Sequence, residues 1–161
     1  MLPEAVAQNP AAVAVEQELP GAIVDATVAF GEVSLGIARE RIAAVCRILK
    51  ESVGFEQLSA VTAVDWWPRE PRFEVIYFLR SFRHNSRLRL TVRVAEDEPI
   101  DSVCSMWRGA NWYEREVFDL FGIPVQNHPN LERIMMPADW EGYPLRKDYP
   151  VHGHKYSYQD Q

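Results

Sequence analysis

Alternating apolar and polar residues mark three β-strands in the middle of the chain. The alternation is strict over residues 87–94, where one face carries only Leu and Val and the other carries three Arg and one Thr. Residues 57–66 also alternate, with Leu58, Ala60, Thr62, Val64 and Trp66 on one face. Residues 73–80 are largely apolar on both faces, which is typical of a strand inside a sheet. We predict three neighbouring strands, the last two joined by a turn at 83–86.

Two shorter strands are predicted nearer the start of the chain. Residues 23–30 and 32–38 have strand-like composition and flank Gly31, which is a hairpin signal. A short helix is expected over 11–18. Residues 1–9 are expected to be loose.

The segment between the two sets of strands predicts a helix over 39–53. Its apolar residues fall on one stripe, formed by Ile42, Val45, Cys46, Leu49 and Val53. Gly54 follows at the position of a C-terminal cap. Because Cys46 lies on the apolar stripe, we interpret it as a core residue rather than a reactive thiol.

The pattern becomes helical again after Pro99. Asp101 can cap a helix in which Val103, Met106, Trp107 and Ala110 share one face. Asn111, with Glu114 three residues later, resembles a capping box and predicts a second helical start. The apolar stripe of this second helix is Tyr113, Val117, Leu120 and Phe121, and Gly122 ends it. Glu114, Arg115, Glu116 and Asp119 lie mostly off the stripe, so we expect a solvated face.

The predicted element order is α-β-β-α-β-β-β, which is typical of an α+β fold. We expect a two-layer sandwich of a mixed sheet and helices with an extended C-terminal arm. The 161 residues suit one domain with additional chain rather than two domains. We divide the chain into a flexible N-terminus (1–9), an α+β globular domain (10–122) and an extended partner-binding arm (123–161).

The arm differs in composition from the domain. From Gly122 onward there are five prolines and no sustained period. The segment is nevertheless too apolar to leave in water, with Ile123, Val125, Leu131, Ile134, Met135, Met136, Trp140, Tyr143, Leu145 and Tyr149. It either folds back over its own sheet or lies on another protein. We favour the second alternative because such segments gain buried area on association.

Charge is unevenly distributed along the chain. The net charge is −6 and the pI is about 5.2, which argues against a general nucleic-acid binder. Residues 71–95 nevertheless carry six arginines and one acidic residue, Glu74, between two acidic segments. This basic ribbon is either the solvated face of a hairpin or a docking face for an acidic partner, and both interpretations stay open.

The chain lacks the common sequence motifs of enzymes. It contains no Gly-rich nucleotide-binding loop, no nucleophile elbow and no HExxH. Its cysteines, Cys46 and Cys104, are far apart, which excludes a CxxC site, a four-thiolate iron–sulfur site and a disulfide framework. Because no signal peptide is visible and there is no apolar run of about 18 residues, we expect a cytoplasmic protein. The residues alone indicate a binding or scaffolding protein.

Two groups of histidines have alternative roles. His152 and His154, with Asp148 or Asp160 nearby, have metal-ligand character, but a solvated tail is the favoured interpretation. His128 precedes Pro129 in a turn-like segment and is interpreted as a turn or interface histidine rather than a base.

The charged run Arg146-Lys147-Asp148 follows a proline in the arm. It forms either a solvated bend or an arginine fork for a carboxylate on a partner.

Four segments together resemble one known family. They are residues 107–123, whose centre reads Glu114-Arg-Glu-x-x-Asp119-x-Phe-Gly-Ile123, then 127–129, 131–134 and 139–150. These segments closely resemble the thirty-kilodalton subunit of the proton-pumping NADH:quinone oxidoreductase, respiratory complex I, and the resemblance covers most of the chain. The family usually has His where this chain has Tyr143, a change that keeps an aromatic ring with a polar tip.

The resemblance implies a cofactor-free accessory subunit of the hydrophilic arm of that complex. Such a complex transfers electrons from NADH through FMN and iron–sulfur clusters, held by partner subunits, to quinone such as ubiquinone, and couples this to proton translocation. The implied partners are the large hydrogenase-like quinone-site subunit, which the C-terminal tail covers, and neighbouring iron–sulfur subunits. The implied location is peripheral, on the cytoplasmic side of the bacterial inner membrane.

Other functions stay open beside this one. The first is the equivalent subunit of a related hydrogenase or deazaflavin-linked dehydrogenase complex. The second is a single-stranded nucleic-acid module that uses strand 87–94. The third is a small enzyme that uses His128 with Glu114 or Asp119.

The predicted site binds partners, and no catalytic, cofactor-binding or metal-binding residue is expected in this chain. Aromatic residues and arginines dominate interface energetics, which favours members of the helix 111–121 and of the arm. The predicted partner-binding residues are Trp112, Glu114, Arg115, Glu116, Asp119, Phe121, His128, Pro129, Trp140, Leu145, Arg146, Lys147, Asp148 and Tyr149.

Overall fold

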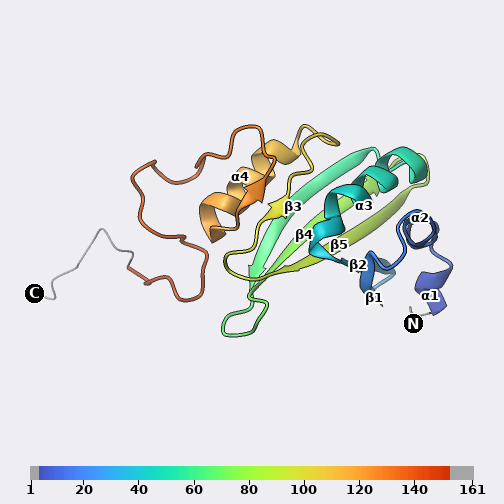
Figure 1. Cartoon of the computed structure of the whole chain (residues 1–161), viewed down its shortest axis with the longest axis horizontal. Coiled ribbons are helices and arrows are strands. Elements are labelled where there is room, and N and C mark those ends of the chain that lie inside the picture. Colours follow the sequence, from blue (N-terminus) through green and yellow to red (C-terminus); the bar gives the residue numbers. More distant parts are fainter. Residues whose placement is uncertain (1–3, 153–161) are drawn as a thin grey trace, which may run out of the picture.

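A five-stranded mixed sheet forms the centre of the protein, as Figure 1 shows for the computed structural model. The structure describes residues 4–152. The strands are β1 (Ile23–Ala29), β2 (Glu32–Ile37), β3 (Gln57–Asp65), β4 (Phe73–Ser81) and β5 (Ser86–Val94). Their order in the sheet is β1-β2-β5-β4-β3. Only β2 and β5 are parallel among these neighbours, so the predicted α+β sandwich with a mixed sheet is confirmed.

Helices cover one face of the sheet. Helix α2 (Pro10–Glu18) precedes the first hairpin, and the predicted helix 39–53 consists of η1 (Arg39–Arg41), α3 (Ile42–Ile48) and η2 (Leu49–Val53). Helix α3 lies across the sheet in Figure 1. Of the predicted stripe, Ile42, Val45, Cys46 and Leu49 are buried and pack with inward residues of the strands, while Val53 is partly buried. This apolar contact between the two layers is the core of the domain.

Helix α4 (Ala110–Phe121) lies beside the outer strand β3 and begins the part of the chain that matters most for function. Gly122 follows it with a φ of 74°, a left-handed conformation that a residue with a Cβ adopts only at a cost. A Cβ at Gly122 would also lie 2.5 Å from the ring of Tyr143. The predicted end of the helix is therefore confirmed, and glycine is required there for two reasons.

The expected helix from Asp101 is wrong. Residues Ile100–Asp101 instead form the short strand β6, which pairs in parallel with β7 (Val125–Gln126). Turns follow up to Gly109, which occupies the N-cap position of α4, so Asn111 is not the cap. The backbone of residues 100–102 is used in pairing with the segment after α4, and a sequence pattern cannot show this competing partner.

The expectation that residues 1–9 are loose also needs correction. The segment 1–9 is not wholly loose, because α1 (Glu4–Ala7) forms there and Val6 is fully buried. Asn9 then caps α2 by accepting hydrogen bonds from the backbone N–H of Ala11 and Ala12.

The alternation predicted for residues 57–66 is interrupted. A bulge between Leu58 and Ala60 shifts the register, so that Leu58 is buried together with Val61 and Ala63 rather than with Thr62. By contrast, β5 keeps its strict alternation, with leucines and valines inward and arginines outward.

The chain beyond Gly122 begins in the core and then leaves it. Ile123 and Val125 are buried, and residues 127–152 form a wide loop beyond the end of α4. None of the helices within residues 4–152 is long and apolar enough to cross a lipid bilayer.

Candidate partner-binding site

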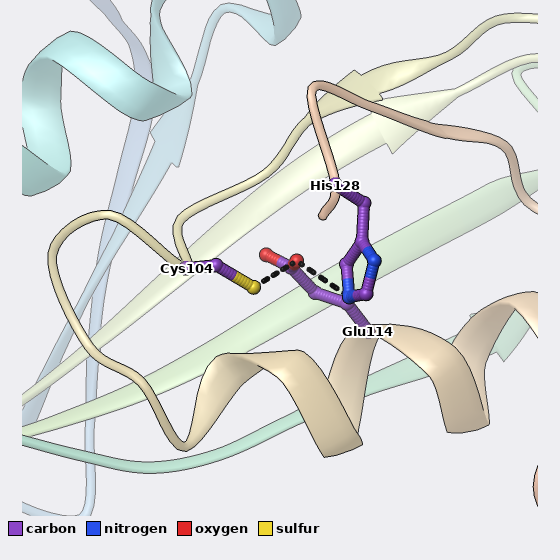
Figure 2. Close-up of side chains that lie close together, drawn as sticks. All are labelled: Cys104, Glu114 and His128. Atoms are coloured by element: carbon purple, nitrogen blue, oxygen red, sulfur yellow. Dashed lines mark hydrogen bonds and ion pairs between the residues drawn. The ribbon is translucent and has the colours of Figure 1, made fainter. Parts of the chain in front are cut away.

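Glu114, near the start of α4, is a carboxylate with no exposed surface. Its oxygens accept hydrogen bonds from the hydroxyl of Ser102 at 2.7 Å, from the backbone N–H of Val103 at 2.7 Å and from the thiol of Cys104 at 3.1 Å. The Nε2 atom of His128 lies 3.8 Å from the same carboxylate (Figure 2). Burial, followed by Glu114 as a hydrogen-bond partner and neighbouring charge, raises the pKa of the Cys104 thiol to about 12. This thiol is therefore a poor nucleophile.

Asp119, one turn and a half further along α4, organises the arm. Its Oδ2 atom accepts hydrogen bonds from the backbone N–H of Ile134 at 3.0 Å, Met135 at 2.7 Å and Met136 at 2.9 Å. Arg133 donates to Oδ1 at 2.7 Å. Burial alone would raise the pKa of Asp119, but these donors outweigh it and lower the pKa. We call these five residues the Asp119 cluster.

The expected solvated face of α4 is wrong for two of its four members. Glu114 and Asp119 are both fully buried, because loops on either side of the helix supply donors that compensate for desolvation. Glu116 is exposed, as expected. Arg115 does not pair with Asp119: it donates to the backbone carbonyl of Glu132 and lies over the ring of Trp112.

A second cluster fastens the arm to the sheet, and we call it the Arg72 cluster. Arg72, which is 3% exposed, forms a two-pronged pair with Asp65 at 2.9 and 3.0 Å. Its guanidinium also reaches Asp148 of the arm at 2.5 Å and Glu96 at 3.2 Å. The backbone N–H of Lys147 donates to Asp65 at 2.8 Å.

These contacts hold two carboxylates of the cluster in their ionised form. Burial opposes ionisation of Asp65, but the hydrogen bonds from Arg72 and from two backbone N–H groups prevail and lower its pKa to about 2. Arg72 is also the main cause of the lowered pKa of Asp148.

Arg146 occupies the space between the two clusters. Its Nε–H donates to the carbonyl of Phe121 at 2.6 Å, and its guanidinium pairs with Glu96. It also stacks on the rings of Tyr143, at 4.6 Å, and Phe73, at 5.2 Å. Arg146 therefore makes a single-nitrogen ion pair with a carboxylate of its own chain, and the expected fork on a partner's carboxylate stays a prediction.

Both alternatives for the arm have support in these contacts. Its residues 133–136 and 147–148 are fastened to the domain through the Asp119 and Arg72 clusters, while Met135 and Leu145 remain 58% and 52% exposed. The indole nitrogen of Trp140 is buried without a hydrogen-bond partner. The arm is thus positioned by its own domain and still presents apolar surface outward.

The predicted partner-binding residues divide into three groups by exposure. Glu114, Asp119 and Phe121 are buried in the chain and do not offer a surface to a partner. Arg115, His128, Trp140, Arg146 and Tyr149 are intermediate. Trp112, Glu116, Pro129, Leu145, Lys147 and Asp148 are exposed. A partner role for the residues of the last two groups stays a prediction.

Of the two tail histidines, for which a solvated tail is the favoured interpretation, His152 is exposed and His154 lies outside the described residues. The alternative enzyme is expected to use His128 with Glu114 or Asp119. The structure brings His128 close to Glu114, whereas Asp119 pairs with Arg133. His128 forms part of a turn, since its Nδ1 atom accepts from the N–H of Asn130.

The outer face of β5 carries Arg87, Arg89 and Arg93, which we call the basic sheet face. Arg89 lies over the ring of Phe78 and Arg93 over that of Trp66. The Nε atom of Arg89 is buried without a hydrogen-bond partner. Arg87 and Arg93 also pair within the chain, with Glu32 at 3.6 Å and Glu74 at 3.7 Å, so the solvated-face and docking-face interpretations both stay open.

Sequence reasoning missed several residues that build the site. Asp65, Glu96 and Arg133 receive no role from pattern or motif, although they fasten the arm. Arg72, counted in the basic ribbon 71–95, is buried rather than on its surface. The sequence gives one signal for Arg72, because this charged residue stands directly before an apolar strand. A charge buried at that position needs a buried partner. Its partner, Asp65, sits at the end of another strand, and only the sheet register joins them.

Comparisons with known proteins agree with the resemblance of the sequence. A family model described as "Respiratory-chain NADH dehydrogenase, 30 Kd subunit" matches residues 35–155. A protein of Geobacter sulfurreducens, named as an NADH-quinone oxidoreductase subunit, is 46% identical over 147 residues, covering 90% of this chain and 91% of that protein. Its namesake in Roseiflexus sp. is 48% identical over 136 residues, covering 83% and 78%.

A solved structure is also similar. It is described as the membrane-bound sulfane sulfur reductase, an archaeal respiratory membrane complex, and one of its chains aligns with a TM-score of 0.73 at 27% identity. The alignment covers 85% of this chain and 82% of that one.

Proposed function

This chain belongs to the family of the 30 Kd subunit of respiratory-chain NADH dehydrogenase, and we propose that it is a non-catalytic scaffold of the quinone-site module. It is a subunit of a multi-subunit respiratory enzyme complex. Within that complex, the proposed role is to position neighbouring chains rather than to transfer electrons.

One observation supports this proposal most directly. Two carboxylates in the segment that carries the family resemblance hold the backbone of neighbouring loops through hydrogen bonds. Glu114 holds the turn at 102–104, and Asp119 holds residues 133–136 of the arm. Both side chains are fully buried and occupied by hydrogen bonds. A carboxylate used in this way fixes geometry, and fixed geometry is what an accessory subunit supplies to catalytic neighbours.

The proposal extends to partners and cofactors. The exposed apolar side chains of the arm, with Trp112 on α4, are the surface proposed to contact the large hydrogenase-like subunit and neighbouring iron–sulfur subunits. FMN and the iron–sulfur clusters are proposed to lie in those partners. The proposed location is peripheral, on the cytoplasmic side of the bacterial inner membrane.

Gentle purification of the complex tests the proposal. The chain is tagged in its own host, the membranes are solubilised in a mild detergent, and the eluate is assayed for flavin, iron–sulfur absorbance and NADH:quinone activity. We expect all three to follow the tag. A tagged chain that elutes alone, without flavin or iron, contradicts the proposal.

A second candidate is the equivalent subunit of a related complex with another electron donor. The similarity to a chain of the sulfane sulfur reductase complex favours it. The same purified material distinguishes the two, because NADH reduces the clusters of the first complex only. Retained clusters that NADH does not reduce point to the second candidate.

A further inference from the structure

Three metal-ligating side chains from distant parts of the sequence converge at one point. Cys104 comes from the turn after β6, Glu114 from α4 and His128 from the start of the arm after β7 (Figure 2). Their sulfur, oxygen and nitrogen atoms all lie within 4.8 Å of one another. Glu114 and the His128 side chain have no exposed surface, and Cys104 is partly exposed.

The charge balance of this cluster is incomplete. The donors to Glu114 are a hydroxyl, a backbone N–H and a thiol, all neutral. Within residues 4–152, the only ion-pair partner of Glu114 is His128. The Nδ1 atom of His128 accepts a hydrogen bond from the N–H of Asn130, so Nε2 carries the ring proton and donates to the carbonyl oxygen of Asn111 at 3.2 Å rather than to Glu114. A buried carboxylate without a counter-charge is costly.

We propose that Cys104, Glu114 and His128 bind one divalent cation of the Zn²⁺ type. Tetrahedral Zn²⁺ with ordinary bond lengths separates a sulfur from an oxygen ligand by about 3.5 Å and a nitrogen from an oxygen ligand by about 3.3 Å. The corresponding distances are 3.1 Å from Cys104 to Glu114 and 3.8 Å from His128 to Glu114. The sulfur of Cys104 and Nε2 of His128, which lie within 4.8 Å of each other, must also come to about 3.5 Å, so side-chain rotations complete the site.

The charges and protons of the proposed binding step can all be accounted for. A thiolate and a carboxylate together neutralise the two positive charges of the ion, and the thiol proton leaves to solvent. The ring proton of His128 moves from Nε2 to Nδ1, so the carbonyl of Asn111 loses its donor and the N–H of Asn130 loses its acceptor. Water replaces both partners, since Asn130 is exposed and Asn111 is half-buried. The fourth ligand is water, which enters from the side where Cys104 is exposed.

The ion would tie the start of the arm to the domain. His128 follows β7 directly, whereas Cys104 and Glu114 belong to the body of the protein. A metal that bridges them stabilises the bound form of this junction, and the gain grows with the logarithm of the metal concentration divided by its Kd. This inference does not depend on the proposed scaffold role, because it concerns the purified chain.

Cobalt titration of the metal-free full chain tests the proposal. Co²⁺ is added to wild type, Cys104→Ala and His128→Gln, and the sulfur-to-cobalt charge-transfer absorption is recorded. We expect one Co²⁺ per chain with that absorption in wild type. Cys104→Ala should abolish the band, and His128→Gln should weaken binding by about tenfold or more, since even outer-shell changes cost 10–100-fold.

Matched controls separate this site from the other thiol and histidines. Cys46→Ala and His84→Gln should leave the titration unchanged, and so should His152→Gln combined with His154→Gln. A wild type without the band, a band that survives Cys104→Ala, or binding that is lost only with the tail histidines overturns the proposal. A rise in Tm on addition of Zn²⁺, present in wild type and absent in Cys104→Ala, gives a second measurement that confirms both proteins are folded.

Discussion

Arg72 and Asp148 lie 76 positions apart in the sequence, yet the Arg72 guanidinium donates to Oδ1 of Asp148 at 2.5 Å. Arg72 is simultaneously paired with the buried Asp65. The arm therefore closes onto a charge pair that is already part of the domain. The two carboxylates should contribute differently, because one is buried and the other is at the surface.

Asp148→Asn should loosen the arm without unfolding the domain. The substitution removes one charged partner from Arg72 and leaves the pair with Asp65 in place. We expect faster proteolytic cleavage within residues 127–152, with the free energy of unfolding changed by no more than about 1 kcal/mol. Asp97→Asn, at an exposed position in the neighbouring turn, is the control and should cleave like wild type.

The stability of the chain should fall in acid because of Asp65. Its pKa is lowered to about 2 in the folded state, so protonation favours the unfolded chain. The contribution is fully present above the unfolded pKa of about 4 and is lost as the pH falls through about 2. The loss for this group is on the order of 2 kcal/mol.

Urea unfolding at a series of pH values measures this loss. Asp65→Asn should be less stable at neutral pH and should show a shallower decline between about pH 4 and pH 2. An identical slope in the variant and in wild type would show that other carboxylates account for the acid sensitivity.

Asp119→Asn should destabilise the chain more than any exposed substitution on α4. The amide has no charge for Arg133 and cannot accept three N–H groups equally well, and the position is fully buried. We expect a loss of about 3 kcal/mol in the free energy of unfolding. Glu116→Gln, on the exposed side of the same helix, should change it by less than about 0.5 kcal/mol.

Asp119 is buried and Glu116 on the same helix is exposed, and this difference shows what the sequence pattern can and cannot predict. The strands and the helix at 39–53 are predictable because each has one face against a single core, and periodicity records this directly. The environment of Asp119 depends on residues 133–136, which return to α4 through a loop without periodicity. A local pattern therefore assigns Asp119 to solvent.

The bulge in β3 and the strand β6 were missed for a similar reason. In each case a partner strand decides the conformation, β4 in the first and β7 in the second. The resemblance to a family identified the important segment, but it did not indicate that Glu114 and Asp119 are internal supports. Only the three-dimensional contacts separate those supports from exposed candidates such as Trp112.

The basic sheet face should bind an acidic protein surface rather than nucleic acid. Arg87→Glu combined with Arg93→Glu reverses charge at two exposed positions, removes the ion pairs of these arginines with Glu32 and Glu74, and leaves the inward face of β5 intact. We expect a lower yield of assembled complex, and a wild-type complex whose recovery falls as salt rises. Arg47→Glu on α3 is the control for charge reversal elsewhere.

The same variants examine the nucleic-acid alternative. Fluorescence anisotropy with a labelled single-stranded oligonucleotide should show no salt-dependent binding by wild type. Binding that weakens with salt and disappears in the double variant would instead support a single-stranded nucleic-acid module.

Trp112→Ala should weaken assembly while leaving the isolated chain as stable as wild type. Trp112 is 61% exposed on α4, with Arg115 stacked over its ring, so its removal leaves no cavity in the core. Alanine is also the better helix former, and we expect the free energy of unfolding to change by less than about 0.5 kcal/mol. Exposed tryptophans of this kind gain their energy when a partner covers them, so recovery of the tagged complex should fall several-fold. Phe30→Ala, at an exposed turn between β1 and β2, is the matched control and should not affect recovery. If the complex is recovered equally with both variants, Trp112 does not belong to the contact surface. The exposed residues of the arm would then be the remaining candidates for partner contact.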